Sequence, residues 1–199
     1  MAQTVNIFPT PIFTYKLDEE DNNLIHKKIA EAIPKSKFGM PWPEAVKSTF
    51  QFEGDCNVIK KFNLELLETR IIQSAIAYMQ SIPTKIIPEL YIKDSWMNIS
   101  KKNSQQNSHI HPLSLISGVY YYKTTGEEGD LVFENPNQIV DFMYNSGQIW
   151  PNEFAIKPTA GLLVLFPSWL RHYVDINNTD NDRIVLAFNL VPRGGPLSC

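Results

Sequence analysis

The stretch that decides the fold opens with Asn107-Ser108-His109-Ile110-His111 and continues through Ser117-Gly118-Val119-Tyr120-Tyr121-Tyr122. It then passes through Phe166-Pro167-Ser168-Trp169-Leu170-Arg171-His172 and closes on Asp182-Arg183-Ile184-Val185-Leu186. Short apolar runs between turn residues are typical of strands in a sandwich or barrel. Three of the chain's four histidines lie in this stretch.

The three histidines predict a metal site. His109 and His111 are two residues apart, so on a strand their side chains leave from the same face. With His172 from a distant strand, they would supply three imidazoles, the commonest metal ligands in proteins. Three ligands on one side of an ion leave other positions open, which suits catalysis better than a closed structural site.

The composition is that of an ordinary globular protein. The 199 residues predict one domain, 43% are hydrophobic and 20% are charged. A net charge of −3 without a basic block argues against nucleic-acid binding. Two cysteines, Cys56 and Cys199, predict no disulfide framework. We expect no signal peptide and no membrane span, and therefore a cytoplasmic protein.

The first part of the chain predicts an arm and two helices. Pro9 and Pro11 mark residues 6–15 as an edge strand or extended arm. Asp18 is the expected cap of a first helix that ends at Pro34, and Asn63 is the expected cap of a second. The second helix carries an apolar stripe that predicts core packing, made of Leu64, Leu67, Ile71, Ala75, Tyr78 and Ile82. His26 is expected on the solvated surface of the first helix.

The later part predicts strands. Leu90–Ser100 alternates, with Leu90, Ile92, Asp94, Trp96 and Asn98 expected on one face. Further strands are expected over residues 115–122, 131–133, 162–166 and 184–190, with a weak one within 138–151. We therefore expect a single domain in which residues 1–86 form the arm and helices and residues 87–193 form the β core. Residues 34–57 are expected to be an irregular loop, one candidate for a lid over a site.

Arg183 predicts an anion site. On a strand it shares a face with Val185, Ala187 and Asn189, while the opposite face is apolar. A guanidinium in such surroundings requires an anionic partner. The partner is either a protein carboxylate, such as neighbouring Asp182, or the carboxylate of a small co-substrate held in a bidentate contact. A surface position at the start of the strand, which needs no such partner, is the remaining alternative. Arg183 follows His172 by eleven residues, a distance that one tight hairpin would cover.

These motifs resemble those of the iron(II)/2-oxoglutarate-dependent dioxygenase superfamily, over roughly residues 90 to 193. The resemblance implies a mostly β jelly roll, the double-stranded β-helix, with the N-terminal helices packed outside it. It implies oxidation, and in most cases hydroxylation, of a substrate with Fe(II) and 2-oxoglutarate. His109 and His172 match the family's two histidine ligands, and Arg183 matches the residue that binds the distal carboxylate of 2-oxoglutarate. Tyr121 and, more loosely, Asn98 are the other candidates for that pocket.

Two departures from the family pattern stand out. His111 occupies the position where most of the superfamily has a carboxylate, so three neutral imidazoles would leave the metal its full charge. Val185 interrupts the family's Arg-x-Ser pattern. Two alternatives therefore stay open: a non-catalytic metal-binding module on the same fold, and a three-histidine zinc enzyme that uses metal-bound hydroxide. A cupin site and a nucleophilic hydrolase are rejected, because the glutamate of the first and the nucleophile turn of the second are absent.

The substrate is not specified by these motifs. Trp96, Trp150 and Trp169 are candidates for lining a pocket, although large aromatic residues also serve as core. Trp96 and Trp169 are the two we assign to a substrate site. We expect a small-molecule or peptide substrate, no nucleic acid and no membrane partner, and a homodimer is left open.

Overall fold

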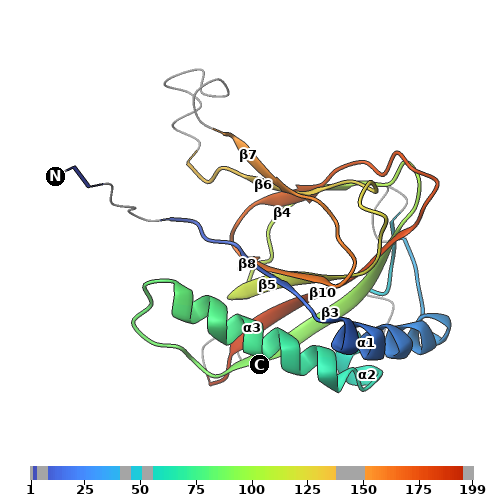
Figure 1. Ribbon diagram of the computed structural model, residues 1–199, viewed down its shortest axis with the longest axis horizontal. Coiled ribbons are helices and arrows are strands. Elements are labelled where there is room, and N and C mark those ends of the chain that lie inside the picture. Colours follow the sequence, from blue (N-terminus) through green and yellow to red (C-terminus); the bar gives the residue numbers. More distant parts are fainter. Residues whose placement is uncertain (1, 4–8, 41–45, 51–55, 138–150, 195–199) are drawn as a thin grey trace.

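Two antiparallel sheets form the body of the protein in the computed structural model (Figure 1). The structure describes the chain except for residues 1, 4–8, 41–45, 51–55, 138–150 and 195–199. The larger sheet has the order β1 (Phe13–Lys16), β8 (Leu162–Pro167), β5 (Ile116–Lys123), β10 (Arg183–Pro192), β3 (Leu90–Ser100) and β2 (Val46–Ser48). The smaller sheet has the order β4 (Gln106–His109), β9 (His172–Val174), β6 (Leu131–Glu134) and β7 (Glu153–Ile156).

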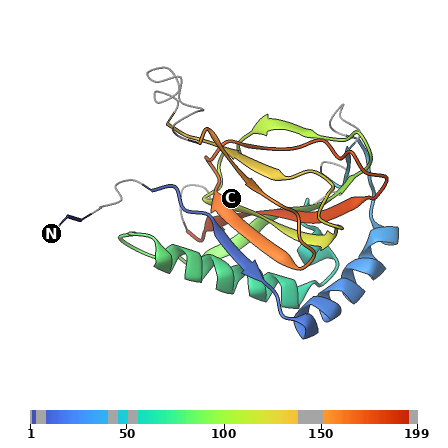
Figure 2. The ribbon, with the colours of Figure 1, turned by 45° about the horizontal axis from the view of Figure 1, so that its top comes forward.

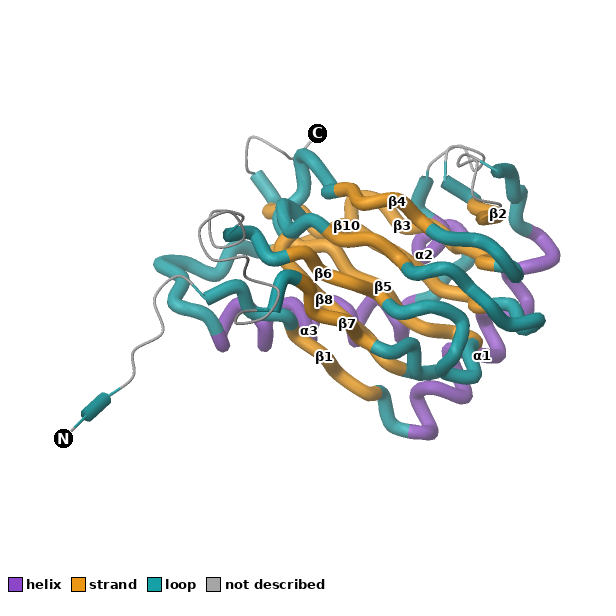
Figure 3. Tube along the Cα trace, turned by 90° about the horizontal axis from the view of Figure 1, so that it is seen from above, coloured by secondary structure: helices purple, strands orange, loops and turns teal. Residues whose placement is uncertain are grey.

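The helices cover the outer face of the larger sheet. They are α1 (Glu19–Ala32), the 3-10 turn η1 (Ile33–Lys35), α2 (Val58–Lys61) and α3 (Glu65–Ser81). Figures 2 and 3 show α1 and α3 on one side of the strands, with the smaller sheet on the other side. The predicted jelly roll with external helices is confirmed. None of the described helices is long and apolar enough to span a membrane.

Capping explains where the helices begin. Asp18 caps α1 as predicted, since its side chain accepts a hydrogen bond from the backbone N–H of Asp21. The prediction for Asn63 is wrong, because α3 begins after Leu64 without a side-chain cap. Asn63 instead has a φ of 51°, in the left-handed region that asparagine tolerates, and lies in the turn between α2 and α3. The unpredicted helix α2 is capped by Asn57, which accepts from the N–H of Lys60.

Two hydrophobic clusters lie on either side of the larger sheet. The predicted α3 stripe is buried between the helices and the sheet, where Leu67, Ile71 and Ala75 are fully covered. There it packs with the outward-facing residues of β10, Leu186, Phe188 and Leu190. The second cluster fills the space between the sheets and consists of Tyr121, Leu131, Phe133, Val164, Phe166, Leu170, Val174 and Val185. The inner face of the larger sheet is therefore the floor of the sandwich.

A β-bulge in β3 changes which side chains reach that floor. Asn189 of β10 pairs with Asp94, but the next residue, Leu190, pairs with Ile92, so β3 contributes an extra residue, Lys93. The predicted strict alternation of β3 is wrong at this point. Ile92 packs toward the helices, whereas Asp94 lies two residues on and lines the interior. Bulges commonly redirect side chains in this way beside functional sites.

Three other expectations are corrected. His172 and Arg183 are not joined by a hairpin, because β9 belongs to the smaller sheet and β10 to the larger, so residues 175–182 cross between sheets. Residues 1–86 contain one strand that was not expected, since β2 forms one edge of the larger sheet, whereas β1, at the other edge, is the edge strand predicted for the arm. His26 is half-buried with its ring 4.7 Å from that of Tyr122, and burial lowers its pKa. The weak strand expected within 138–151 falls almost wholly outside the described residues.

Candidate metal centre

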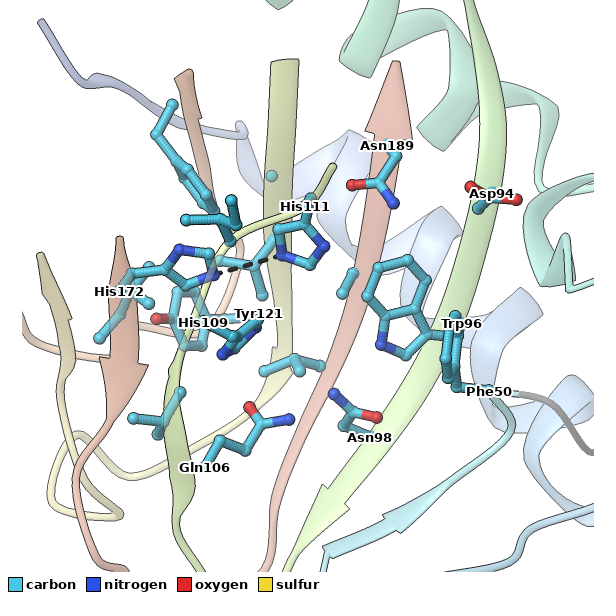
Figure 4. Close-up of a pocket in the computed structure, with 18 of the residues that line it drawn as sticks. Phe50, Asp94, Trp96, Asn98, Gln106, His109, His111, Tyr121, His172 and Asn189 are labelled. Atoms are coloured by element: carbon cyan, nitrogen blue, oxygen red, sulfur yellow. Dashed lines mark hydrogen bonds between the residues drawn. The ribbon is translucent and has the colours of Figure 1, made fainter. Parts of the chain in front are cut away.

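The three predicted histidines meet inside the sandwich. Their candidate ligand atoms all lie within 4.8 Å of one another, and Nε2 of His111 is 3.3 Å from Nε2 of His172 (Figure 4). His109 and His172 are directly opposite each other on β4 and β9. His111 lies beyond the end of β4, so the pair is not on one strand face as expected. The backbone N–H of His111 donates to the carbonyl of Ser168, at 2.9 Å, which ties the loop after β4 to the loop before β9.

Hydrogen bonds fix which ring nitrogen is free to bind a metal. Nδ1 of His109 lies 2.7 Å from the carbonyl oxygen of Asn107, and Nδ1 of His172 lies 2.8 Å from that of Leu170. Because a carbonyl only accepts, Nδ1 must carry the proton in both rings. Each Nε2 is then left with its lone pair, which is the arrangement that carbonyl partners impose on metal-bound histidines. The donor set therefore fits a metal ion.

The surroundings keep the imidazoles neutral. Burial, together with the proximity of His172 and His109, lowers the pKa of His111 to about 3. Burial also lowers the pKa of His172 to about 4, with His109 contributing. The pKa of His109 is lowered for the same reason, although its bond to Asn107 opposes the shift. Neutral rings are the form that binds metal, so the cluster is ready for an ion at neutral pH.

The histidines open onto a cavity of about 350 Å³ between the two sheets. Arg183 lines it and is buried, with 2% of its surface exposed. Its Nη1 donates to the carbonyl of Gly129 at 2.9 Å and its Nη2 to Oγ of Ser100 at 3.3 Å. Its Nε has no partner among the described residues, and no described carboxylate forms an ion pair with it. The internal salt bridge weighed for Arg183 is therefore absent from the described part of the chain.

The remaining predicted site residues divide between the cavity and the surface. Tyr121, Asn98 and Trp96 line the cavity, and the side-chain oxygen of Asn98 is buried without a hydrogen-bond partner among the described residues. Burial raises the pKa of Tyr121 to about 12, although the nearby charge of Arg183 opposes the shift. Trp169 is not in the cavity, since its side chain is 57% exposed in the turn between β8 and β9. Trp150 lies outside the described residues.

The residues of the cavity wall that were not predicted for the site include the polar Gln106 and Asn189 and the aromatic Phe50. Asn189 was already placed on the strand face of Arg183, and that shared face was the available signal. Phe50 lies two residues after the end of β2, and its ring is 5.2 Å from that of Trp96. Glu134 and Asp94 are the first alternatives if His111 is not a metal ligand. Glu134 lies 3.9 Å from the guanidinium of Arg171, and Asp94 lines the cavity.

Comparison with known proteins points to one family. The family model described as "Putative 2OG-Fe(II) oxygenase" matches residues 94–189, which include the three histidines and Arg183. No curated protein sequence matches the chain.

Solved structures share the fold at low identity. A 2OG-Fe(II) oxygenase family oxidoreductase from Burkholderia pseudomallei has a TM-score of 0.63 at 14% identity, covering 92% of this chain and 85% of that one. A prolyl-4-hydroxylase from Pseudomonas putida has a TM-score of 0.61 at 13% identity, covering 92% and 94%. HygX from Streptomyces hygroscopicus, solved with nickel, 2-oxoglutarate and hygromycin B, has a TM-score of 0.61 at 10% identity, covering 93% and 84%.

Proposed function

We propose that this chain, which its family match and histidine triad indicate to be a 2OG-Fe(II) oxygenase, hydroxylates a C–H bond of its substrate. Nε2 of each histidine would hold the Fe(II) ion. Iron with bound 2-oxoglutarate supplies the oxygen-activating redox chemistry, which belongs to the cofactor. The chain's own residues bind and orient both small molecules and exclude water.

The 2-oxoglutarate site is assigned to the inner face of β10 and its neighbours. Arg183 would hold the distal carboxylate, and the hydroxyl of Tyr121, on the adjacent strand β5, would donate to the same group. The raised pKa of Tyr121 keeps that hydroxyl protonated, so it can act as a donor. Asn98 lines the same end of the cavity, one strand to the other side.

The observation that carries the proposal is the buried guanidinium without a carboxylate. A buried charge is costly unless it is paired, and the described residues offer Arg183 only a carbonyl and a hydroxyl. Burial lowers the pKa of Arg183, while Tyr121, Glu128 and Asp130 oppose the shift, so the guanidinium stays charged. A small dianion bound in the cavity would satisfy this charge. Three neutral ligands favour the same dianion, because they leave the metal its full +2 charge.

Calorimetric titration of 2-oxoglutarate into nickel-loaded protein tests this. Truncating one partner of a buried charge pair costs about 2–5 kcal/mol, so Arg183→Ala should weaken 2-oxoglutarate binding by roughly 30- to 4000-fold. Metal binding should be unchanged, since Arg183 is not among the ligand candidates. Arg183→Lys should recover only part of the affinity, because an ammonium lacks the two-pronged contact.

The matched control is Arg193→Ala. Arg193 is an exposed arginine that pairs with Glu89 at the far end of β10, so its removal should leave 2-oxoglutarate affinity unchanged. Absence of 2-oxoglutarate binding to the wild-type protein would refute the proposal and favour the metal-binding module or the zinc enzyme. Equal affinity of wild type and Arg183→Ala would remove the assigned role of Arg183.

A further inference from the structure

The cavity floor carries two opposite charges at its two ends. Among the described residues that line the cavity, Asp94 is the one carboxylic acid and Arg183 is the one arginine or lysine. Both lie on the paired strands β3 and β10, where Asp94 faces Asn189 and Arg183 faces Ser100. Six residues of strand separate Asp94 from Ser100, a span of roughly 20 Å. The floor is therefore polarised along its length.

The proposed function fills only the end at Arg183. A short dicarboxylate that reaches from Arg183 to the histidines leaves the part of the floor at Trp96, Asp94 and Asn189 for the substrate. The ring of Trp96 lies 5.7 Å from that of His111, which places this free part directly beside the metal ligands. Figure 4 shows Asp94, Trp96 and Asn98 in succession along β3, with Asn189 beside Asp94.

Asp94 has the surroundings of a receptor for a cation. Its side chain is half-buried, and no described residue forms an ion pair or a side-chain hydrogen bond with it. The rings of Phe50 and Trp96 lie 5.2 Å apart and line the same cavity as Asp94, and aromatic faces attract cations. The opposite residue, Asn189, accepts a hydrogen bond of 2.8 Å from Ser117 at its Oδ1, and its uncharged amide does not neutralise the carboxylate.

We propose that the substrate carries an ammonium or guanidinium group, which Asp94 binds beside the aromatic wall of Trp96 and Phe50. This inference rests on the proposed function and names the substrate class for that site. Asp94 faces the cavity because it is in phase with Trp96 and Asn98 along β3, and the bulge at Lys93 ends this face by turning Ile92 toward the helices.

The floor also sets the spacing within the substrate. Asp94 and Trp96 are two residues apart on β3, roughly 7 Å. The oxidised carbon should lie beside Trp96 and His111, and the charged nitrogen beside Asp94. The distance between the two atoms of the substrate is therefore about the length of a lysine or arginine side chain. Nε1 of Trp96 is buried and has no acceptor among the described residues, so the substrate should also present a carbonyl or similar acceptor there.

Saturation-transfer NMR on nickel-loaded protein with 2-oxoglutarate tests the inference by binding alone. The cationic probes are Nα-acetyl-lysine methylamide and Nα-acetyl-arginine methylamide, and the neutral analogue is Nα-acetyl-norleucine methylamide. At least one cationic probe should bind about tenfold or more tightly than the norleucine analogue. Asp94→Asn should abolish that preference while its affinity for 2-oxoglutarate, measured by calorimetry, stays at the wild-type value.

Asp180→Asn is the matched control, since it removes the same charge from an exposed position that pairs with Lys102. It should keep the preference for the cationic probe. Three results would overturn the inference. The cationic and neutral probes could bind equally, the preference for the cationic probe could survive in Asp94→Asn, or Asp94 could be required for binding the uncharged sugar methyl glucoside and not the cationic probes. The probe titrations are also carried out without 2-oxoglutarate. They therefore test the substrate class independently of 2-oxoglutarate binding, whose failure would refute the proposed function and not this inference.

Discussion

His111 is the residue that sets this metal site apart from the donor set the family resemblance implies. A carboxylate at that position would reduce the charge at a divalent ion, whereas a neutral imidazole leaves it unchanged. The ring of His111 is held among the other two, with centroids 5.1 Å from both His109 and His172. Its Nε2 lies 3.3 Å from Nε2 of His172, and the candidate ligand atoms of all three rings lie within 4.8 Å of one another.

Replacing His111 with alanine should weaken nickel or Fe(II) binding by more than roughly 10- to 100-fold. That range is typical of losing a residue that only hydrogen-bonds to a metal ligand. His111→Asp should restore part of the affinity, because a carboxylate is also a competent ligand. Anaerobic metal titration measures both. The fourth histidine provides the control: His26→Ala should bind metal as the wild type does, since His26 packs against Tyr120 and Tyr122 in the helix layer. Wild-type affinity in His111→Ala would show that His111 is not a ligand.

Single residues show how far a sequence can specify a site. His109, His111, His172 and Arg183 could be assigned from their spacing and chemistry, and the structure brings them to one cavity. Trp169 could not, because the direction of a side chain in a turn depends on how the flanking strands are paired. Asp94 was placed correctly on the strand face of Trp96 and Asn98, but the same alternation put Ile92 there too. The bulge that separates the two depends on pairing with β10, a strand almost a hundred residues away.

The turn after β5 is the element that prepares the anion site. Burial alone would raise the pKa of Glu128, but hydrogen bonds from Thr124, Thr125 and backbone N–H groups lower it to about 2. The carboxylate thereby holds the turn in which Gly129 presents its carbonyl to Arg183. Gly129 has a φ of 88°, and a Cβ there would lie 2.3 Å from the carbonyl oxygen of Asp175. Only glycine fits this position without displacing backbone.

Glu128→Gln should lower the free energy of unfolding at pH 7 by about 1–3 kcal/mol, because it removes the charge from several buried hydrogen bonds. Urea unfolding measures it, and Glu127→Gln, an exposed neighbour, should change stability by less than about 0.5 kcal/mol. The folded-state pKa of Glu128 is depressed, so its contribution is present above pH 4.5 and is lost as the pH falls toward 2. The difference between wild type and Glu128→Gln should therefore shrink over that range. A constant difference would contradict the role of the carboxylate.

Elements with a local signal were predictable, and elements defined by distant pairing were not. The apolar spacing of α3 and the runs of β8 and β10 identify those elements from their own residues. The short helix α2 is only four residues long, so it has no periodic signal of its own. The crossing of residues 175–182 between the sheets is a property of the closed sandwich, which no local pattern contains.

The whole molecule holds its two ligand groups on different sheets. The histidines come from β4, the loop after it, and β9, at the smaller sheet, whereas Arg183 belongs to β10 of the larger sheet. A bound metal would therefore link parts of the smaller sheet, and 2-oxoglutarate would connect the metal to the larger sheet. Ligands that bind only the folded state raise its stability in proportion to the logarithm of their concentration.

Thermal unfolding should therefore show two separate increments. Nickel at 100 times its dissociation constant should add about 2.7 kcal/mol, which for a chain of this size is an increase in Tm of about 5–11 °C. Adding 2-oxoglutarate to the nickel-loaded protein should raise Tm again, whereas 2-oxoglutarate without metal should add little, because the keto-acid end lacks its ligand. Arg183→Ala should keep the nickel increment and lose the second one. His172→Ala should lose both, because the second ligand depends on the first. If 2-oxoglutarate raised Tm equally with and without metal, the metal and 2-oxoglutarate would bind independently and would not share one site.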